Sequence, residues 1–310
     1  MRLIPTLGLL ILSAITAAAQ TSATARTPQG HPDFQGIWAN DTVTPLERPR
    51  RFADKDVLSE SEATEYEKDV IGRWRDKFGD LEVTTSGELD DAWQEYGRVV
   101  PTRRTSLIVD PVDGRIPALT PRAKALADAR AEATKMHPAD GPEDRPLADR
   151  CLGGTTGPPM LPPPYSGILQ IVQTPQYTLV FNEMMNDVRI VRMAVEHRPT
   201  AIRQWLGDSI GRWDGDTLVI ETTNFTDKTH FRGSGTELRV IERLTRVSPD
   251  TIRYDFTIED AASFTRPWSG ALWLHRTDKR MYEYACHEGN HSMTDILRGA
   301  RAADTKSEKR

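Results

Sequence analysis

Apolar and polar side chains alternate along most of the chain after residue 168, and this alternation is the strongest structural signal in the sequence. In residues 252–259 every second side chain is apolar, and the residues between them are Arg, Asp, Thr and Glu. A period of two is typical of a β-strand with one face in the core and the other against solvent or a polar lumen. The neighbouring segment 238–246 is less regular, because Glu242 shares a face with three apolar residues. A carboxylate in that register predicts a position at the rim of the core or a functional role.

Short turn signals separate the alternating segments, so the pattern predicts about nine strands in hairpin order. Asp214-Gly215, for example, is a favoured two-residue hairpin turn. The predicted strands are 168–173, 177–183, 188–193, 209–213, 217–222, 238–246, 252–259, 268–275 and 281–286. A long sheet of neighbouring hairpins tends to curl and close, because closure removes its exposed edges. We therefore expect a mainly β fold, an antiparallel meander that closes into a barrel or strongly curved sheet. A β-sandwich is the alternative.

Helices are expected in two regions that flank the predicted sheet in the sequence. Ser59 and Glu62 form a capping box ahead of apolar residues at helical spacing, which predicts a first N-terminal helix. Thr120 as the cap and Pro121 at the first helical position predict the start of a second N-terminal helix. The second of these helices runs to about residue 135. A C-terminal helix is expected near residues 292–302.

The N-terminus has the pattern of a signal peptide. Arg2 precedes an apolar run over residues 7–15, and Ala17-Ala18-Ala19 offers small residues for cleavage. The run is too short to span a bilayer, so a retained membrane anchor is the less favoured alternative. We expect a periplasmic or secreted protein with no integral membrane segment after cleavage.

Changes in composition along the sequence divide the chain into four segments. We expect a signal peptide over 1–19, an extended arm over 20–57, a helical and Pro/Gly-rich segment packed on the barrel over 58–167, and the barrel-like region with its helix over 168–310. Within the segment 58–167, a short hairpin is expected at 107–109 with a turn over 110–114.

Composition and net charge limit the classes of binding partner that we expect. The 310 residues carry a formal net charge of −5, which gives no support for binding nucleic acid or an anionic membrane. There are 2 cysteines, Cys151 and Cys286. In an oxidising compartment they are expected to pair, although a free nucleophilic thiol is the alternative.

Several motifs carry a resemblance to a family of exported, uncharacterised bacterial proteins. They lie at residues 32–38, 149–151, 205–209, 211–225, 264–268 and 284–290. In addition, Gly36-Ile37-Trp38 ahead of a β-meander with a C-terminal helix resembles the pattern of lipocalin-like, or calycin, barrels. The lipocalin-like resemblance implies a ligand-binding barrel. The family resemblance implies export and carries no particular activity.

The sharpest local pattern is His287-Glu288-Gly289-Asn290-His291, which fits His-Glu-x-x-His. In zinc peptidases two histidines one helical turn apart bind zinc and the glutamate activates water. Here Gly-Asn favours a turn, so a strand-to-helix turn capped by Asn290 or Ser292 is the competing interpretation. A third hypothesis keeps His287 and Glu288 as a metal-free acid–base pair.

The leading functional hypothesis is an exported enzyme that acts on a small, partly apolar molecule by acid–base chemistry, as a lyase, isomerase or hydrolase. We expect no metal and no organic cofactor. The candidate catalytic residues are His287, Glu288, Asp208 and Arg266, and the candidate substrate-binding residues are Trp205, Trp268, Tyr165, Asn224 and Glu183. Apart from the amide of Asn224, these are titratable or aromatic residues in loops or at strand ends, where sites on β scaffolds are usually built.

Three alternatives remain open at this point. Arg266 and Asp208 could form an ion pair that merely covers the barrel end. The protein could be a non-catalytic lipocalin-like binding protein for a lipid, pigment or aromatic ligand. It could also be an envelope interaction protein that contacts its partner through the arm and the Pro-rich loop, in which case the barrel interior should be packed solid.

Overall fold

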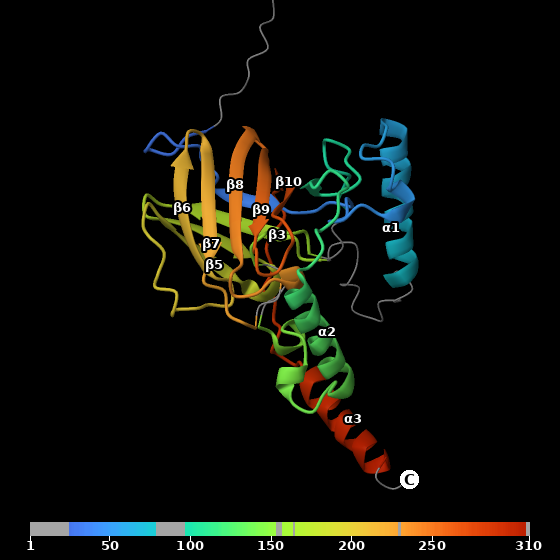
Figure 1. The fold of residues 1–310 in the computed structure, drawn as a ribbon. Helices are drawn as coiled ribbons and strands as arrows, with labels where there is room; N and C mark the ends of the chain where they lie inside the picture. The colour runs from blue at the N-terminus through green and yellow to red at the C-terminus, as the bar shows by residue number, and fades with distance from the viewer. Residues whose placement is uncertain (1–24, 79–96, 153–156, 164, 229–230, 308–310) are drawn as a thin grey trace, which may run out of the picture.

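Nine strands close into a β-barrel in the structure, a computed structural model that describes residues 25–78, 97–152, 157–163, 165–228 and 231–307 (Figure 1). Around the ring the strands are β1 (Gly36–Ala39), β3 (Ile168–Gln173), β4 (Tyr177–Asn182), β5 (Val188–Met193), β6 (Asp208–Asp214), β7 (Thr217–Thr223), β8 (Arg239–Ser248), β9 (Thr251–Glu259) and β10 (Trp268–Arg276), which pairs again with β1. The short β2 (Ile108–Asp110) pairs with β10 outside the ring. The closed barrel is consistent with the lipocalin-like resemblance as a fold. The signal-peptide prediction lies outside the described residues.

Two features of the ring correct the predicted hairpin order. β5 and β6 pair in parallel, joined by residues 194–207, which we call the crossover segment. Only a small residue fits where these strands meet, since a Cβ at Gly211 would lie 2.7 Å from the Met193 sulfur. The second correction is that the four-residue β1, from the predicted extended arm, closes the ring.

The predicted strand 281–286 is not a strand. Its backbone bonds to side chains instead of to a neighbouring strand: the Tyr282 N–H donates to Glu183 Oε2 at 3.0 Å, and the Tyr284 N–H and carbonyl both bond the Asn186 amide, at 3.2 and 3.0 Å. The predicted hairpin over 107–114 is also replaced, because residues 108–110 pair with β10.

The barrel interior is filled with side chains. The large fully buried residues include Trp38, Tyr254, Phe256, Leu169 and Ile171. At the end where β3 begins and β4 ends, a cavity of about 10 Å³ is found, room for about one water molecule. The described part of the barrel therefore has a packed core rather than a hollow lumen.

An ion pair lies within this core, which places Glu242 neither at the rim nor in a cleft. The Arg189 and Glu242 side chains are 4% and 0% exposed, and two guanidinium nitrogens bond the two carboxylate oxygens. The Tyr254 hydroxyl donates to Glu242 at 2.7 Å and accepts from the Met160 N–H at 2.8 Å. Burial raises the pKa of Tyr254 well above its ordinary value, and the neighbouring Glu242 carboxylate adds to this.

Both ends of the barrel are covered. At one end Met160, in the Pro-rich segment, is buried, and its carbonyl accepts from the Asn40 amide at 3.0 Å. At the other end the guanidinium carbons of Arg276 and Arg246 lie 4.9 and 5.5 Å from the Trp38 ring centroid, a cation–π arrangement.

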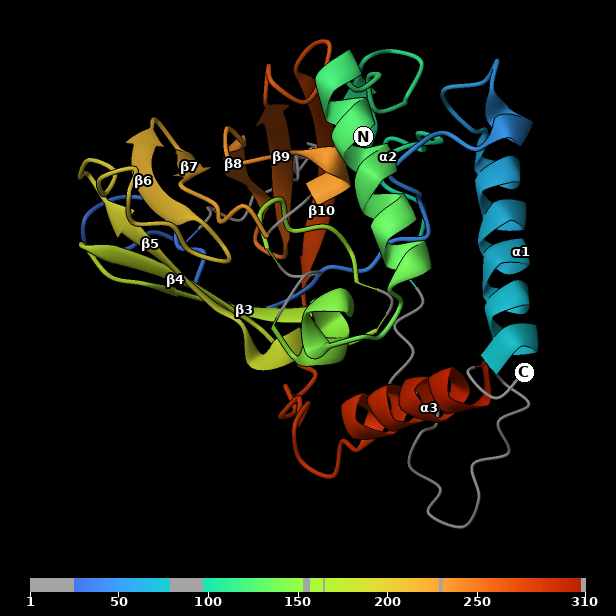
Figure 2. The ribbon, with the colours of Figure 1, turned by 60° about the horizontal axis from the view of Figure 1, so that its bottom comes forward.

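In the described part of the chain, three α-helices lie outside the barrel (Figures 1 and 2). They are α1 (Glu60–Phe78), α2 (Pro121–Met136) and α3 (Ser292–Ser307), and the short 3₁₀ helices are η1 (Arg50–Phe52), η2 (Pro142–Asp144), η3 (Ala148–Arg150), η4 (Met184–Asn186) and η5 (Phe231–Gly233). The start signals read in the sequence are present. Ser59 and Glu62 bond each other's backbone N–H, and the Thr120 hydroxyl accepts from the Ala123 N–H at 3.2 Å. Within the described part of the chain, no helix is long and apolar enough to cross a membrane.

The predicted disulfide between Cys151 and Cys286 is confirmed. It joins the residue after η3 to the irregular segment that precedes α3. Tyr284 of this segment also contacts Tyr165 of the Pro/Gly-rich region: their hydroxyls lie 3.2 Å apart, and burial together with this hydrogen bond raises the pKa of Tyr284 to about 12. The disulfide therefore connects the Pro/Gly-rich region to the C-terminal part of the chain.

Candidate functional site

The structure does not bring the four predicted catalytic residues into one described contact network. His287 and Glu288 are exposed in the turn before α3. Arg266 pairs with Asp110 at 2.8 Å, so the alternative of an ion pair with Asp208 is not what forms. Asp208 is buried at the start of β6. The acid–base role of these residues stays a prediction.

The turn that holds His287 has the capping geometry expected from the competing interpretation. The Asn290 side chain accepts from the Ser292 N–H at 3.0 Å, and its amide donates to the Cys286 carbonyl at 2.9 Å. Within the described ranges, no three His, Cys, Asp or Glu side chains lie close enough together to hold a metal ion.

The predicted substrate-binding residues are spread over the molecule. Trp268 is fully buried, with its ring 6.0 Å from that of Phe231. Glu183 and Tyr165 hold the C-terminal segment, as described above. Asn224 bonds the crossover segment, and Trp205 belongs to it. Asn224 and Trp205 therefore point to one region of the fold.

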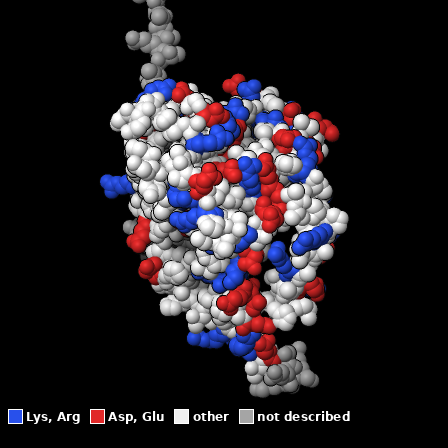
Figure 3. All heavy atoms as spheres, turned by 60° about the vertical axis from the view of Figure 1, so that its left-hand side comes forward, with Lys and Arg blue, Asp and Glu red and all other residues white. Residues whose placement is uncertain are grey.

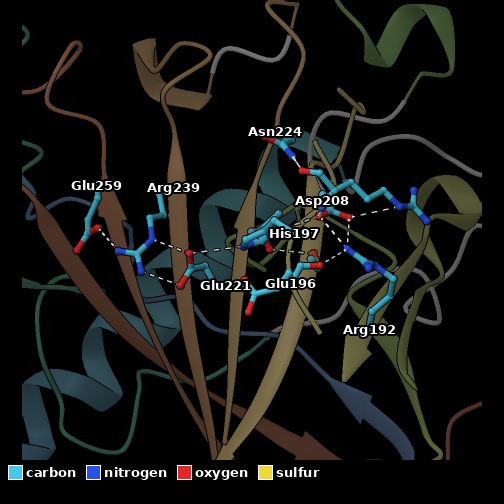
Figure 4. Close-up of polar contacts among 11 residues, drawn as sticks. Arg192, Glu196, His197, Asp208, Glu221, Asn224, Arg239 and Glu259 are labelled. Atoms are coloured by element: carbon cyan, nitrogen blue, oxygen red, sulfur yellow. Dashed lines mark hydrogen bonds and ion pairs between the residues drawn. The ribbon is translucent and has the colours of Figure 1, made fainter. Parts of the chain in front are cut away.

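Asp208 is the centre of a polar network at that region (Figure 4). Its side chain is 3% exposed and accepts hydrogen bonds from Arg192 at 3.0 Å on both oxygens, from His197 Nδ1 at 3.0 Å and from the Arg198 N–H at 2.9 Å. Burial alone would raise the pKa of Asp208, but these donors outweigh it and the pKa is lowered. Asp208 therefore joins β5, β6 and the crossover segment as a carboxylate.

His197 lies between two carboxylates. Beyond Asp208, its Nε2 atom is 3.5 Å from Glu221 Oε1 on β7. Glu221 in turn is bonded by Arg239, which also bonds Glu259. The hydrogen bonds from Arg239 lower the pKa of Glu221 despite its partial burial. The network thus runs across the outer wall from β5 to β9, where basic and acidic side chains intermingle (Figures 3 and 4).

The His197–Asp208 pair has the orientation of a histidine base held by a carboxylate, but it is not arranged to act as one. A general base must present its second ring nitrogen to the substrate. Here Nε2 is buried, makes no hydrogen bond among the described residues, and faces Glu221. The geometry fits a role in fastening the crossover segment to the barrel wall.

The crossover segment is held at its far end as well. Asn224, which has a positive φ of 56°, donates from its amide to the Arg198 carbonyl at 2.9 Å. The Gln204 N–H donates to the Asn224 carbonyl, and the Thr226 N–H donates to the Gln204 carbonyl, at 3.0 and 3.1 Å. These bonds place residues 203–205 beside the connection between β7 and β8.

The two connections border an open surface hollow of about 520 Å³, which we call the crossover hollow. It is lined by Arg203, Trp205, Thr226, Asp227, Lys228 and Thr236. Sequence reasoning nominated Trp205 and missed Arg203, Asp227 and Lys228. A signal was available, because the connections after 193 and after 223 are among the long breaks between strands, and long connections often carry function.

No protein-family model, curated protein or solved structure matches this chain.

Proposed function

We propose that this protein binds a small, partly apolar molecule in the crossover hollow, on the outside of the barrel. The observation that carries the proposal is the difference in volume between the barrel cavity and the crossover hollow. Buried side chains fill the described barrel interior, and the cavity at the barrel end where β3 begins measures about 10 Å³, whereas the crossover hollow has about 520 Å³. Sites for small molecules usually have volumes of about 300–1,000 Å³.

The composition of the hollow supports the same proposal. The half-buried Trp205 offers a flat apolar wall, while Arg203, Lys228 and the two threonines offer polar contacts. A few polar groups beside an aromatic surface are typical of ligand sites. The hollow is built from connections on a rigid barrel, which is where binding residues concentrate.

The filled interior argues against a ligand held inside the barrel in the manner of lipocalins. A filled interior is also what we expect of an envelope interaction protein that contacts its partner through the arm and the Pro-rich loop. In the structure, however, the arm contributes β1 to the ring and the Pro-rich segment covers the barrel end. Neither segment is therefore left free as a docking element in its described part. Binding at the outer hollow is the function that the geometry favours.

We propose that binding takes place in the periplasm or outside the cell. The signal-peptide pattern over residues 1–19 supports this location, and so does the Cys151–Cys286 disulfide, because such bonds persist in oxidising compartments.

The test is amide chemical-shift mapping of the ¹⁵N-labelled protein with a set of small aromatic carboxylates, aromatic amides and monosaccharides. We expect shift changes at residues 203–205, 226–228 and 236, and their loss in Trp205→Ala. Trp213→Ala is the matched control, because Trp213 is half-buried at the opposite end of β6, stacked 4.3 Å from His31. Shift changes located elsewhere, or none with any compound, would overturn the proposal.

A further inference from the structure

Arg203 is held in a defined orientation at the crossover hollow. Its NH1 group donates to the carbonyls of Phe225 and Thr236, both at 3.0 Å. Both acceptors are neutral backbone groups from the connection between β7 and β8. The guanidinium is thereby oriented without being neutralised.

This arrangement differs from that of many arginines in the molecule, although Arg48 and Arg246 also bond backbone carbonyls. Arg189, Arg192, Arg239 and Arg266 each bond a carboxylate. No ion pair of Arg203 is found among the described residues, and its Nε–H and NH2 donors bond no described group. These donors form one edge of the guanidinium plane, and such an edge matches the two oxygens of a carboxylate.

The other charges in the hollow limit the ligand further. Lys228 adds a second cation and Asp227 a carboxylate, so the ionised lining carries a net charge of +1, from two cations and one anion, on a chain of net charge −5. An anion is therefore attracted to this lining. Two carboxylate oxygens lie in one plane, and this matches the planar edge of donors that Arg203 presents.

We infer that the ligand of the crossover hollow is a carboxylate attached to a flat ring. Arg203 bonds both oxygens of the carboxylate and the ring lies against Trp205. The inference rests on the proposed function and adds a specificity determinant to it. Arg203 selects the charged group, and Trp205 binds the ring whether or not the charge is present.

The test compares naphthalene-2-carboxylate, naphthalene-2-carboxamide and 2-naphthyl phosphate by isothermal titration calorimetry at low salt. For the wild type we expect the carboxylate to bind roughly 10-fold or more tightly than the neutral carboxamide, the size of a hydrogen-bonded charge contact. Arg203→Lys keeps the positive charge but loses the paired donors, so it should remove most of this preference.

Carboxamide binding is the control for the shape of the hollow, because it should be nearly unchanged in Arg203→Lys if the wall is intact. Arg212→Lys, at an exposed arginine on β6, should change neither affinity. Equal affinity of the wild type for carboxylate and carboxamide would overturn the inference while leaving the proposed function in place. Tighter binding of the phosphate would overturn the carboxylate assignment. Binding of none of the three would contradict both.

Discussion

The ion pair inside the barrel should be the point at which the fold is most sensitive to a single substitution. Replacing Glu242 with Leu removes the partner of Arg189, whose side chain is only 4% exposed and cannot turn to solvent without disturbing the core. The same substitution removes the acceptor of the Tyr254 hydroxyl.

The expected loss of unfolding free energy follows from the Arg189 charge, which stays buried without its partner. Removing one partner of a buried pair leaves an uncompensated charge and typically costs about 3–5 kcal/mol of unfolding free energy. Replacing both partners, as in Arg189→Met/Glu242→Leu, leaves no charge behind. The double variant should therefore be more stable than Glu242→Leu alone, although it carries one more substitution.

Urea unfolding followed by circular dichroism, with the disulfide intact, gives the unfolding free energies of the four members of the cycle. Glu259→Gln is the matched control, because it breaks a partly exposed pair with Arg239 on the outer wall and should cost about 1 kcal/mol or less. The reasoning fails if Glu242→Leu costs no more than this control, or if the double variant is less stable than Glu242→Leu. Should Glu242→Leu not fold, recovery of a folded protein in the double variant makes the same comparison.

Three further outcomes are expected. Because the pKa of Asp208 is lowered in the folded protein, its contribution to stability is complete above the ordinary Asp pKa of about 3.9 and is lost as the pH falls through the lower folded value. Asp208→Asn should thus cost about 1.5–3 kcal/mol at pH 7, and urea unfolding at lower pH should show the difference shrinking; a difference independent of pH would contradict this. Cys151→Ser/Cys286→Ser should lower the unfolding free energy by up to about 4–5 kcal/mol, whereas unchanged stability would show that the bond constrains little. For the acid–base hypothesis, His287→Ala should abolish turnover of any substrate that the wild type converts while leaving its unfolding curve unchanged, and full turnover would refute that role.

Much of the barrel could be predicted because its signals are local. The alternation in residues 252–259 reappears as a strand whose apolar side chains are buried. The capping residues likewise act on backbone groups close to them in the sequence. The pairing of Cys151 with Cys286 spans 135 residues, but it could be predicted because the chain has 2 cysteines.

The closure of the ring could not be predicted in the same way. β1 is four residues long and pairs with β3 and β10, which lie far along the chain, so no local pattern announces it. The parallel pairing of β5 with β6 depends on the route of the crossover segment. Residues 281–286 alternate like a strand, but side chains of the η4 region bond their backbone groups first.

The candidate site was predicted only in part for the same reason. Trp205 was predicted as an aromatic residue in a loop. Arg203 and Lys228 could not be predicted, because they share a site only where the crossover segment lies beside the connection between β7 and β8. Glu242 was recognised as unusual in its strand. Its partner Arg189 lies on a strand that is not its neighbour in the ring, and periodicity along one strand cannot identify such a partner.

A crystal structure of the protein with naphthalene-2-carboxylate tests the central claim most directly, because it locates the ligand. The account predicts the ring against Trp205 and both carboxylate oxygens on Arg203, with the barrel interior still filled around Tyr254. A ligand found inside the barrel, with Met160 displaced from Tyr254, would contradict it.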